Sequence, residues 1–83
     1  MGFLYILQSD TTGHFYIGST SELERRLAEH FRGHSLATRK RGPWKLVYQE
    51  SFDTLLQARR RESEIKRWKS ASMIRALIQG SVA

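Results

Sequence analysis

Two short apolar and aromatic segments near the N-terminus, joined by a turn sequence, constrain the fold of this chain more than any other feature. Phe3–Gln8 and His14–Ser19 are rich in aromatic and aliphatic residues, which is typical of β-strands. Ser9–Gly13 lies between them and consists of Ser, Asp, Thr and Gly, residues that favour turns. The pattern therefore predicts a β-hairpin with a five-residue loop.

One more strand and three helices are predicted after the hairpin. Capping boxes, in which a hydroxyl and a Glu or Gln three residues later cap a helix start, are indicated at Ser21–Glu24 and Thr54–Gln57. With 83 residues, below the roughly 150 of a typical domain, the chain is expected to form one α/β or α+β domain over residues 1–83, in the order β-β-α-β-α-α on a small antiparallel sheet. The later elements are expected at about Glu22–Phe31 (helix), Arg32–Pro43 (basic loop), Trp44–Glu50 (strand), Thr54–Lys69 (helix) and Ala71–Gln79 (helix).

The positive charge of the chain is concentrated in two segments. The first 24 residues contain no Lys or Arg, and the 14 basic residues lie within Arg25–Lys45 and Arg59–Arg75. Against 8 acidic residues they leave a net charge of +6, which indicates a polyanionic partner, either nucleic acid or an anionic membrane.

Several classes of protein are excluded at this point. The longest apolar run, Phe3–Leu7, is much shorter than the ~20 residues of a membrane span, and no secretory signal is visible. The absence of Cys excludes disulfides, thiolate zinc sites and cysteine nucleophiles, and it fits a reducing cytosol.

Two polar side chains of the first predicted helix share its apolar face. Arg26 and His30 recur at helical spacing with Leu23 and Leu27, whereas Arg25 points to the opposite side. For Arg26 alone, a stem lying over the core is the simpler interpretation, and His30 alone is more often a satisfied core histidine. Together, one turn apart on an inward face, they favour a functional site.

A carboxylate lies in the middle of the apolar stripe of the long predicted helix. Glu62 shares that stripe with Ala58 and Ile65, while Glu64 lies on the opposite, solvated side. An inward carboxylate needs a cation, a metal or hydrogen bonds, so its alternatives are a salt bridge to an arginine or a binding site. The run Arg59–Arg61 is either a solvated face or a rim for phosphates beside Glu62.

Two tyrosines lie on the two strands of the predicted hairpin. Tyr5 and Tyr16 are most simply packing residues with a wet hydroxyl, but pairing of the strands allows both phenols to reach the same face. Gly18 follows closely and would permit close approach of a backbone.

These residues resemble a known family. Tyr5, then Tyr16-Ile17-Gly18, then Arg26 on a helix, then Arg61-Glu62 with Ile65-Lys66 and Trp68, look like the GIY-YIG endonuclease superfamily and its small stand-alone members. The resemblance extends from Phe3 to about Ile78. It implies a three-stranded antiparallel sheet flanked by helices.

The resemblance also implies one-metal hydrolysis of phosphodiester bonds. Glu62 matches the carboxylate that holds a divalent cation, Mg²⁺ or Mn²⁺, and Arg26 the arginine that steadies the scissile phosphate. Tyr5 and Tyr16 match the motif tyrosines, of which either is a candidate base, and His30 falls where some members carry histidine. A guanidinium and a hard cation suit a transition state that gathers charge on phosphate oxygens. No small-molecule cofactor is implied.

The chain departs from the family pattern at three points. Only the tyrosine of the first motif remains in Phe3-Leu4-Tyr5, Ser19 replaces a lysine found in some members, and there is no Asn.

We expect a DNA endonuclease with little sequence preference, because no element is left over to read a groove. Single-stranded, flapped or branched DNA is the expected substrate. A non-catalytic nucleic-acid-binding module and an accessory subunit that needs a partner protein are the alternatives. The expected contacts to nucleic acid are Gly18, Ser19, His34, Thr38, Arg39, Lys40, Arg61 and Lys66.

Overall fold

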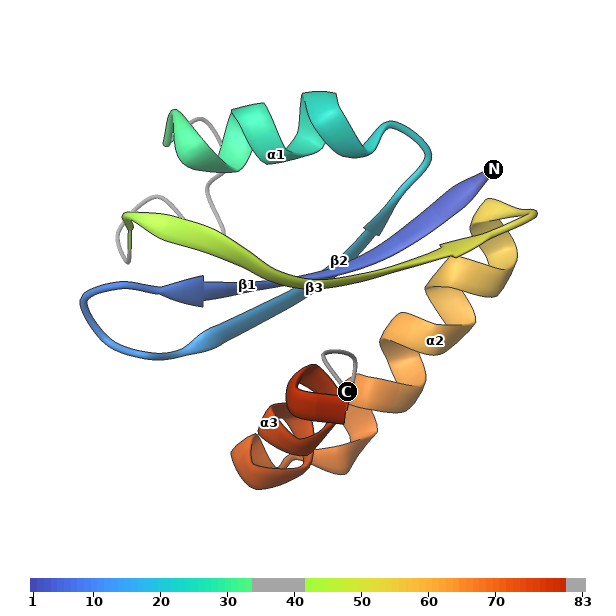
Figure 1. Cartoon of the computed structure of the whole chain (residues 1–83). Coiled ribbons are helices and arrows are strands. Elements are labelled where there is room, and N and C mark those ends of the chain that lie inside the picture. Colours follow the sequence, from blue (N-terminus) through green and yellow to red (C-terminus); the bar gives the residue numbers. More distant parts are fainter. Residues whose placement is uncertain (34–41, 81–83) are drawn as a thin grey trace.

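Three strands and three helices make up the chain in the order β-β-α-β-α-α, which confirms the predicted α+β class (Figure 1). The structure is a computed structural model and describes residues 1–33 and 42–80. His34, Thr38, Arg39 and Lys40 therefore lie outside the described residues. The elements are β1 (Gly2–Ser9), β2 (Phe15–Thr20), α1 (Leu23–Phe31), β3 (Trp44–Phe52), α2 (Leu55–Trp68) and α3 (Ala71–Gly80).

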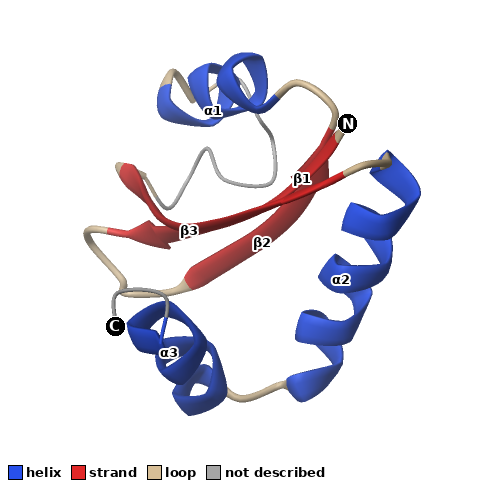
Figure 2. Cartoon of the chain, turned by 45° about the vertical axis from the view of Figure 1, so that its right-hand side comes forward, coloured by secondary structure: helices blue, strands red, loops and turns tan. Residues whose placement is uncertain are grey.

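The three strands form one antiparallel sheet, as predicted, and the structure gives their order in it as β2-β1-β3. β1 is the central strand and β2 is an edge strand. Helix α1 lies over one face of the sheet, and α2 and α3 lie over the other (Figures 1 and 2). None of the helices in the part of the chain that the structure describes is long and apolar enough to cross a membrane.

β1 has no solvent-exposed face, because successive side chains of a strand point to opposite sides and both sides are covered. Leu4 and Ile6 belong to a core with Ile65 of α2 and Ile74 of α3. Tyr5 and Leu7 point the other way, into a smaller core against which the leucines of α1 pack. This explains why the segment is a continuous apolar run rather than an alternating one.

Helix α2 begins in close contact with the start of β1. A Cβ atom at Gly2 would lie 2.5 Å from the carbonyl oxygen of Thr54 and 2.6 Å from Cα of Leu55. Only glycine fits there, because both neighbouring atoms belong to the backbone and cannot rotate away. The close approach fixes the N-terminus of α2 against the sheet.

The two capping boxes predicted from the sequence have different outcomes. Thr54 and Gln57 form the predicted box, with each side chain accepting a hydrogen bond from the other residue's backbone N–H, at 3.2 and 3.1 Å. The prediction for Ser21 is wrong: α1 begins at Leu23, its N-cap is Glu22, and no side chain caps it. The hydroxyl of Thr20, at the end of β2, instead accepts the backbone N–H of Glu22, so the turn out of the strand sets the helix start.

Trp68 ends α2 and packs against the same core cluster as Leu77 and Ile78 of α3. Its ring is half-buried and also lies under the guanidinium of Arg61, 5.7 Å from the ring centroid. Trp68 therefore contributes to the packing between α2 and the final helix.

The two predicted caps provide a matched pair of substitutions for stability. We expect Thr54→Ala to lower the free energy of unfolding by about 1 kcal/mol, because it leaves a backbone N–H at the start of α2 without its acceptor. Ser21→Ala should change it by less than about 0.5 kcal/mol, since Ser21 caps nothing. Urea unfolding followed by circular dichroism measures both, and equal losses would contradict the assignment.

Candidate active site

The phenol of Tyr5 lies across β2 at Gly18, its direct partner in the strand register. A Cβ atom at Gly18 would be 2.5 Å from the Tyr5 hydroxyl and 2.6 Å from Cζ, so the glycine makes room for the ring. Sequence reasoning assigned this space to a backbone, and the structure assigns it to a side chain. The Tyr5 side chain is 1% exposed, and its hydroxyl lies 2.9 Å from Nε2 of His30.

Burial keeps both members of this pair uncharged. It raises the pKa of Tyr5 to about 12, although the nearby Arg26 guanidinium opposes the rise. Burial, and then the positive charge of Arg26, lower the pKa of His30 to about 4. At neutral pH the phenol therefore keeps its proton and can donate it to the neutral imidazole.

Tyr16 completes an aromatic cluster with Tyr5, His30 and Trp44. Its ring centroid lies 4.9 Å from that of His30 and 6.3 Å from that of Tyr5. The first residue of β3, Trp44, contacts Tyr16 edge-on at 6.4 Å and is buried. Sequence analysis placed Trp44 on a strand but did not connect it with the tyrosines, because the contact joins strands at opposite edges of the sheet. Tyr16 is half-buried and so more accessible than Tyr5.

Arg26 extends from α1 over this cluster, as its place on the apolar face of the helix predicts. Its guanidinium binds Glu29 at 2.7 Å and lies close enough to the phenols of Tyr5 and Tyr16 to interact with both. These groups raise the pKa of Arg26, with Glu29 the largest cause. The side chain is 34% exposed, so one positive charge stands at the border between the buried phenols and solvent. Arg25, by contrast, is 71% exposed and pairs with Glu22.

Glu62 lies on α2, on the other side of the sheet from Arg26. Its carboxylate accepts the hydroxyl of Ser19 through Oε1 and pairs with Nζ of Lys66 through Oε2, both at 2.5 Å. The side chain is 22% exposed. The inward carboxylate is thus compensated by a lysine one turn along its own helix, rather than by the arginine that the sequence offered as one alternative.

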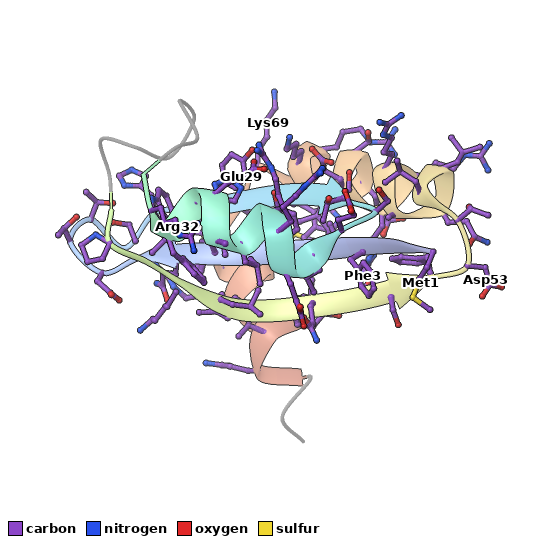
Figure 3. The ribbon with its side chains drawn as sticks, turned by 90° about the horizontal axis from the view of Figure 1, so that it is seen from above. Met1, Phe3, Glu29, Arg32, Asp53 and Lys69 are labelled. Carbon is purple, nitrogen blue, oxygen red and sulfur yellow. The ribbon has the colours of Figure 1, made fainter. Side chains whose placement is uncertain are left out.

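The two halves of the site meet at the exposed edge of β2. Gly18 faces α1 and accommodates Tyr5, while the next residue, Ser19, faces α2 and binds Glu62. The negative charge of Glu62 is near enough to contribute to the raised pKa of Tyr5. In Figure 3, which looks down on α1, α2 emerges beside β2 between Asp53 and Lys69, and Glu29 lies on the same side of α1.

Arg61 is separated from this cluster although it precedes Glu62 in the chain. Its guanidinium binds both carboxylate oxygens of Glu50 on β3, at 3.0 and 3.1 Å, and also pairs with Glu64. β3 and β2 are opposite edges of the sheet, so the two neighbours on α2 face different strands. Glu50 was not singled out in the sequence, and only the register of β3 reveals its role.

Comparison with known proteins shows that the similarity extends over most of the chain. Residues 1–75 match the family of the GIY-YIG catalytic domain. A UPF0213 protein of Staphylococcus saprophyticus is 34% identical over 79 residues, which are 94% of this chain and 95% of that protein. A UPF0213 protein of Halobacterium salinarum is 39% identical over 72 residues, or 86% and 92% of the two chains.

A solved structure also matches. The solution NMR structure of a UPF0213 protein from Bacillus halodurans superimposes with a TM-score of 0.59 at 33% identity. The match covers 95% of this chain and 84% of the other. Fold and sequence therefore agree on the same relatives.

The depressed pKa of His30 predicts a pH dependence of stability. In the unfolded chain this histidine binds a proton below about pH 6.5, whereas in the folded chain it does so only below about pH 4. Stability from the neutral imidazole is therefore present above pH 6.5 and is lost as the pH falls toward 4, by about 3 kcal/mol in total. Urea unfolding measures the free energy of unfolding at pH 7 and pH 4. Between these two pH values the wild type should lose about 3 kcal/mol more than His30→Gln. Identical pH profiles would contradict it.

The contact between Gly18 and Tyr5 predicts a steric effect. Gly18→Ala should lower the free energy of unfolding by about 1–3 kcal/mol, because the new methyl group pushes the phenol away from His30. Gly80→Ala is the control, since no atom lies within 4 Å of its added Cβ. Urea midpoints compare the two, and an unchanged midpoint for Gly18→Ala would show that the Tyr5 ring does not lie over the strand.

Proposed function

Since the chain belongs to the GIY-YIG catalytic domain family, we propose that it is a divalent-metal-dependent endonuclease that hydrolyses phosphodiester bonds of DNA with little sequence preference. The observation that carries this proposal is the convergence of Tyr5, Tyr16, Arg26 and His30 with Glu62 at one edge of the sheet. A nucleic-acid substrate follows from the family, and the choice of DNA is ours.

Glu62 is the residue that would hold the cation. Its carboxylate already accommodates one positive charge, the ammonium of Lys66, and it is partly open to solvent. Among residues 1–33 and 42–80, no three His, Cys, Asp or Glu side chains come together as a metal cluster. A hard ion such as Mg²⁺ or Mn²⁺ suits such a site because it keeps most of its water ligands. When bound, the ion would supply Lewis-acid stabilisation of the phosphate.

Lys66 is then the group that would change partners. With a divalent cation held by Glu62, the ammonium of Lys66 would be free to bind a phosphate of the substrate. Ser19 keeps the carboxylate oriented through its hydroxyl. Both residues remain proposed contacts to nucleic acid, together with the strand edge at Gly18.

Arg26 is proposed to bind the scissile phosphate. Its guanidinium interacts with both phenols and is partly exposed. A planar guanidinium can donate two hydrogen bonds to a phosphate, and Glu29 holds it in place from the side. In the transition state, where negative charge grows on the phosphate oxygens, this contact strengthens.

The two tyrosines receive different roles in this proposal. Tyr5 is buried, stays protonated up to about pH 12 and is held by His30, so it positions the site. Tyr16 is the phenol that a substrate can reach, and we assign it the contact with the attacking water or the phosphate. His30 supports both rings and stays neutral at physiological pH.

A binding module without catalysis is the second candidate function. The observation that favours it is the Lys66–Glu62 ion pair, which satisfies the carboxylate without any metal. An accessory subunit that needs a partner protein would share this arrangement. For the endonuclease, we propose a preference for single-stranded, flapped or branched DNA, because the described elements include none left over to read a duplex groove.

Cleavage assays with Glu62→Gln test the proposal. Wild type is incubated with labelled single-stranded, flapped and duplex DNA in Mg²⁺ or Mn²⁺. Glu62→Gln should cut at least about 100-fold more slowly, because it removes the carboxylate charge while keeping the shape of the side chain. Glu64→Gln on the exposed side of the same helix should cut nearly as fast as wild type.

Each other outcome has a definite meaning. No cleavage by wild type on any substrate would refute a stand-alone enzyme and favour the binding module. Equal cleavage by wild type and Glu62→Gln would refute the assignment of Glu62. Equal losses in both variants would point to a general effect on α2.

A further inference from the structure

The outer side of α2 carries an open groove that takes no part in the site at the edge of β2. The groove has a volume of about 480 Å³ and is lined by Leu56, Arg59, Arg60, Ser63, Glu64 and Arg67. These residues lie on the side of the helix away from its buried residues, Ala58 and Ile65. α2 therefore presents its outer side to solvent, in addition to the sides that face the core, Ser19 of β2 and Glu50 of β3.

The groove is strongly basic because its three arginines pair with no acidic side chain in the part of the chain that the structure describes. Arg59, Arg60 and Arg67 form no ion pair with any carboxylate among the described residues. Glu64, the acidic residue in the lining, is already paired with Arg61. Arg25 and Lys45 elsewhere on the surface behave differently, since each pairs with a carboxylate.

Three like charges on one helix face oppose folding, since their mutual repulsion destabilises the helix. The core does not need them, because all three side chains are exposed. Such a cluster fits an anion that is bound through several contacts at once. Arg60 and Arg67 are two helical turns apart, a separation of about 10 Å along the axis, so the anion must be extended. Guanidinium groups are well suited to phosphates.

An exposed apolar side chain distinguishes the ligand further. Leu56 lines the same groove and is 57% exposed. Stacking in a duplex covers the faces of the bases, whereas an unpaired strand leaves its base faces open to such a side chain. A membrane surface would require a broader apolar face than one leucine.

We propose that this groove binds the phosphodiester backbone of an unpaired nucleic-acid strand, at a site separate from the catalytic cluster. The arginines contact successive phosphates, and Leu56 packs against a sugar or an unstacked base. This proposal rests on the proposed function and extends it. The strand that leaves the cleavage site would bind along α2. Lys66 lies between the two sites, on the flank of α2 that also carries Glu62.

Binding measurements without metal test the groove separately from catalysis. The probe is fluorescein-labelled single-stranded DNA in EDTA, followed by anisotropy at several salt concentrations. Arg59→Gln/Arg60→Gln/Arg67→Gln should bind at least about tenfold more weakly at low salt. The magnitude of the slope of log association constant against log salt concentration should decrease by about 2, since each lost phosphate contact to a single strand contributes about 0.7.

A control of equal charge separates local contacts from net charge. Arg25→Gln/Lys45→Gln/Arg75→Gln also removes three positive charges, one each from α1, β3 and α3. It should keep a slope within about 0.5 of wild type. Equal effects of the two triple variants would overturn the proposal, because binding would then follow total charge. Circular dichroism confirms that both variants are folded.

The choice of an unpaired strand has its own test. Leu56→Ser should weaken binding of single-stranded DNA about threefold or more and leave binding of a duplex of equal length unchanged. Equal losses for both, or none for either, would overturn the assignment to an unpaired strand. Binding of phosphatidylserine vesicles with no binding of DNA would overturn it in favour of a membrane. If binding behaves as expected but wild type cuts nothing in Mg²⁺, the groove stands and the enzyme proposal fails.

Discussion

The central strand β1 is buried on both faces, and the rest of the structure follows from this constraint. Its even-numbered apolar residues form the core beneath α2 and α3, and its odd-numbered residues face α1. One of the latter is Tyr5, which must bury a hydroxyl as well as a ring. A buried hydroxyl without a partner is costly, and His30 of α1 supplies the partner. The same burial keeps the imidazole neutral, so the hydrogen bond joins α1 to the sheet without introducing a charge.

The edge strand β2 divides the candidate site between the two faces of the sheet. Gly18 leaves space for the Tyr5 ring on the side of α1, and Ser19 holds Glu62 on the side of α2. The alternation of a strand places these neighbouring residues on opposite faces, and in the proposed function both halves contact one substrate at the edge of β2. A central strand would have separated them, because neighbouring strands would cover both of its edges.

The extent to which the sequence predicted this arrangement depends on the range of the interactions. The capping box at Thr54 forms as predicted because its contacts span three residues. The same pattern at Ser21 fails because Thr20, at the end of a strand, competes for the turn. Arg26 and His30 point inward as their spacing with two leucines predicts, and Glu62 does too. Their partners came only from the structure: Tyr5 for His30, Glu29 for Arg26, and Ser19 with Lys66 for Glu62.

The sequence by itself determined the order of the elements, the inward faces of the helices and the concentration of positive charge in Arg25–Lys45 and Arg59–Arg75. These properties depend on periodicity and composition, which are local. The tertiary structure decided how that charge is distributed. Arg61 is neutralised by Glu50 on β3, while its neighbours Arg59 and Arg60 remain free of carboxylate partners among the described residues. The physical reason is that a carboxylate on a distant strand comes within reach of one guanidinium only when strand register and helix packing are both in place.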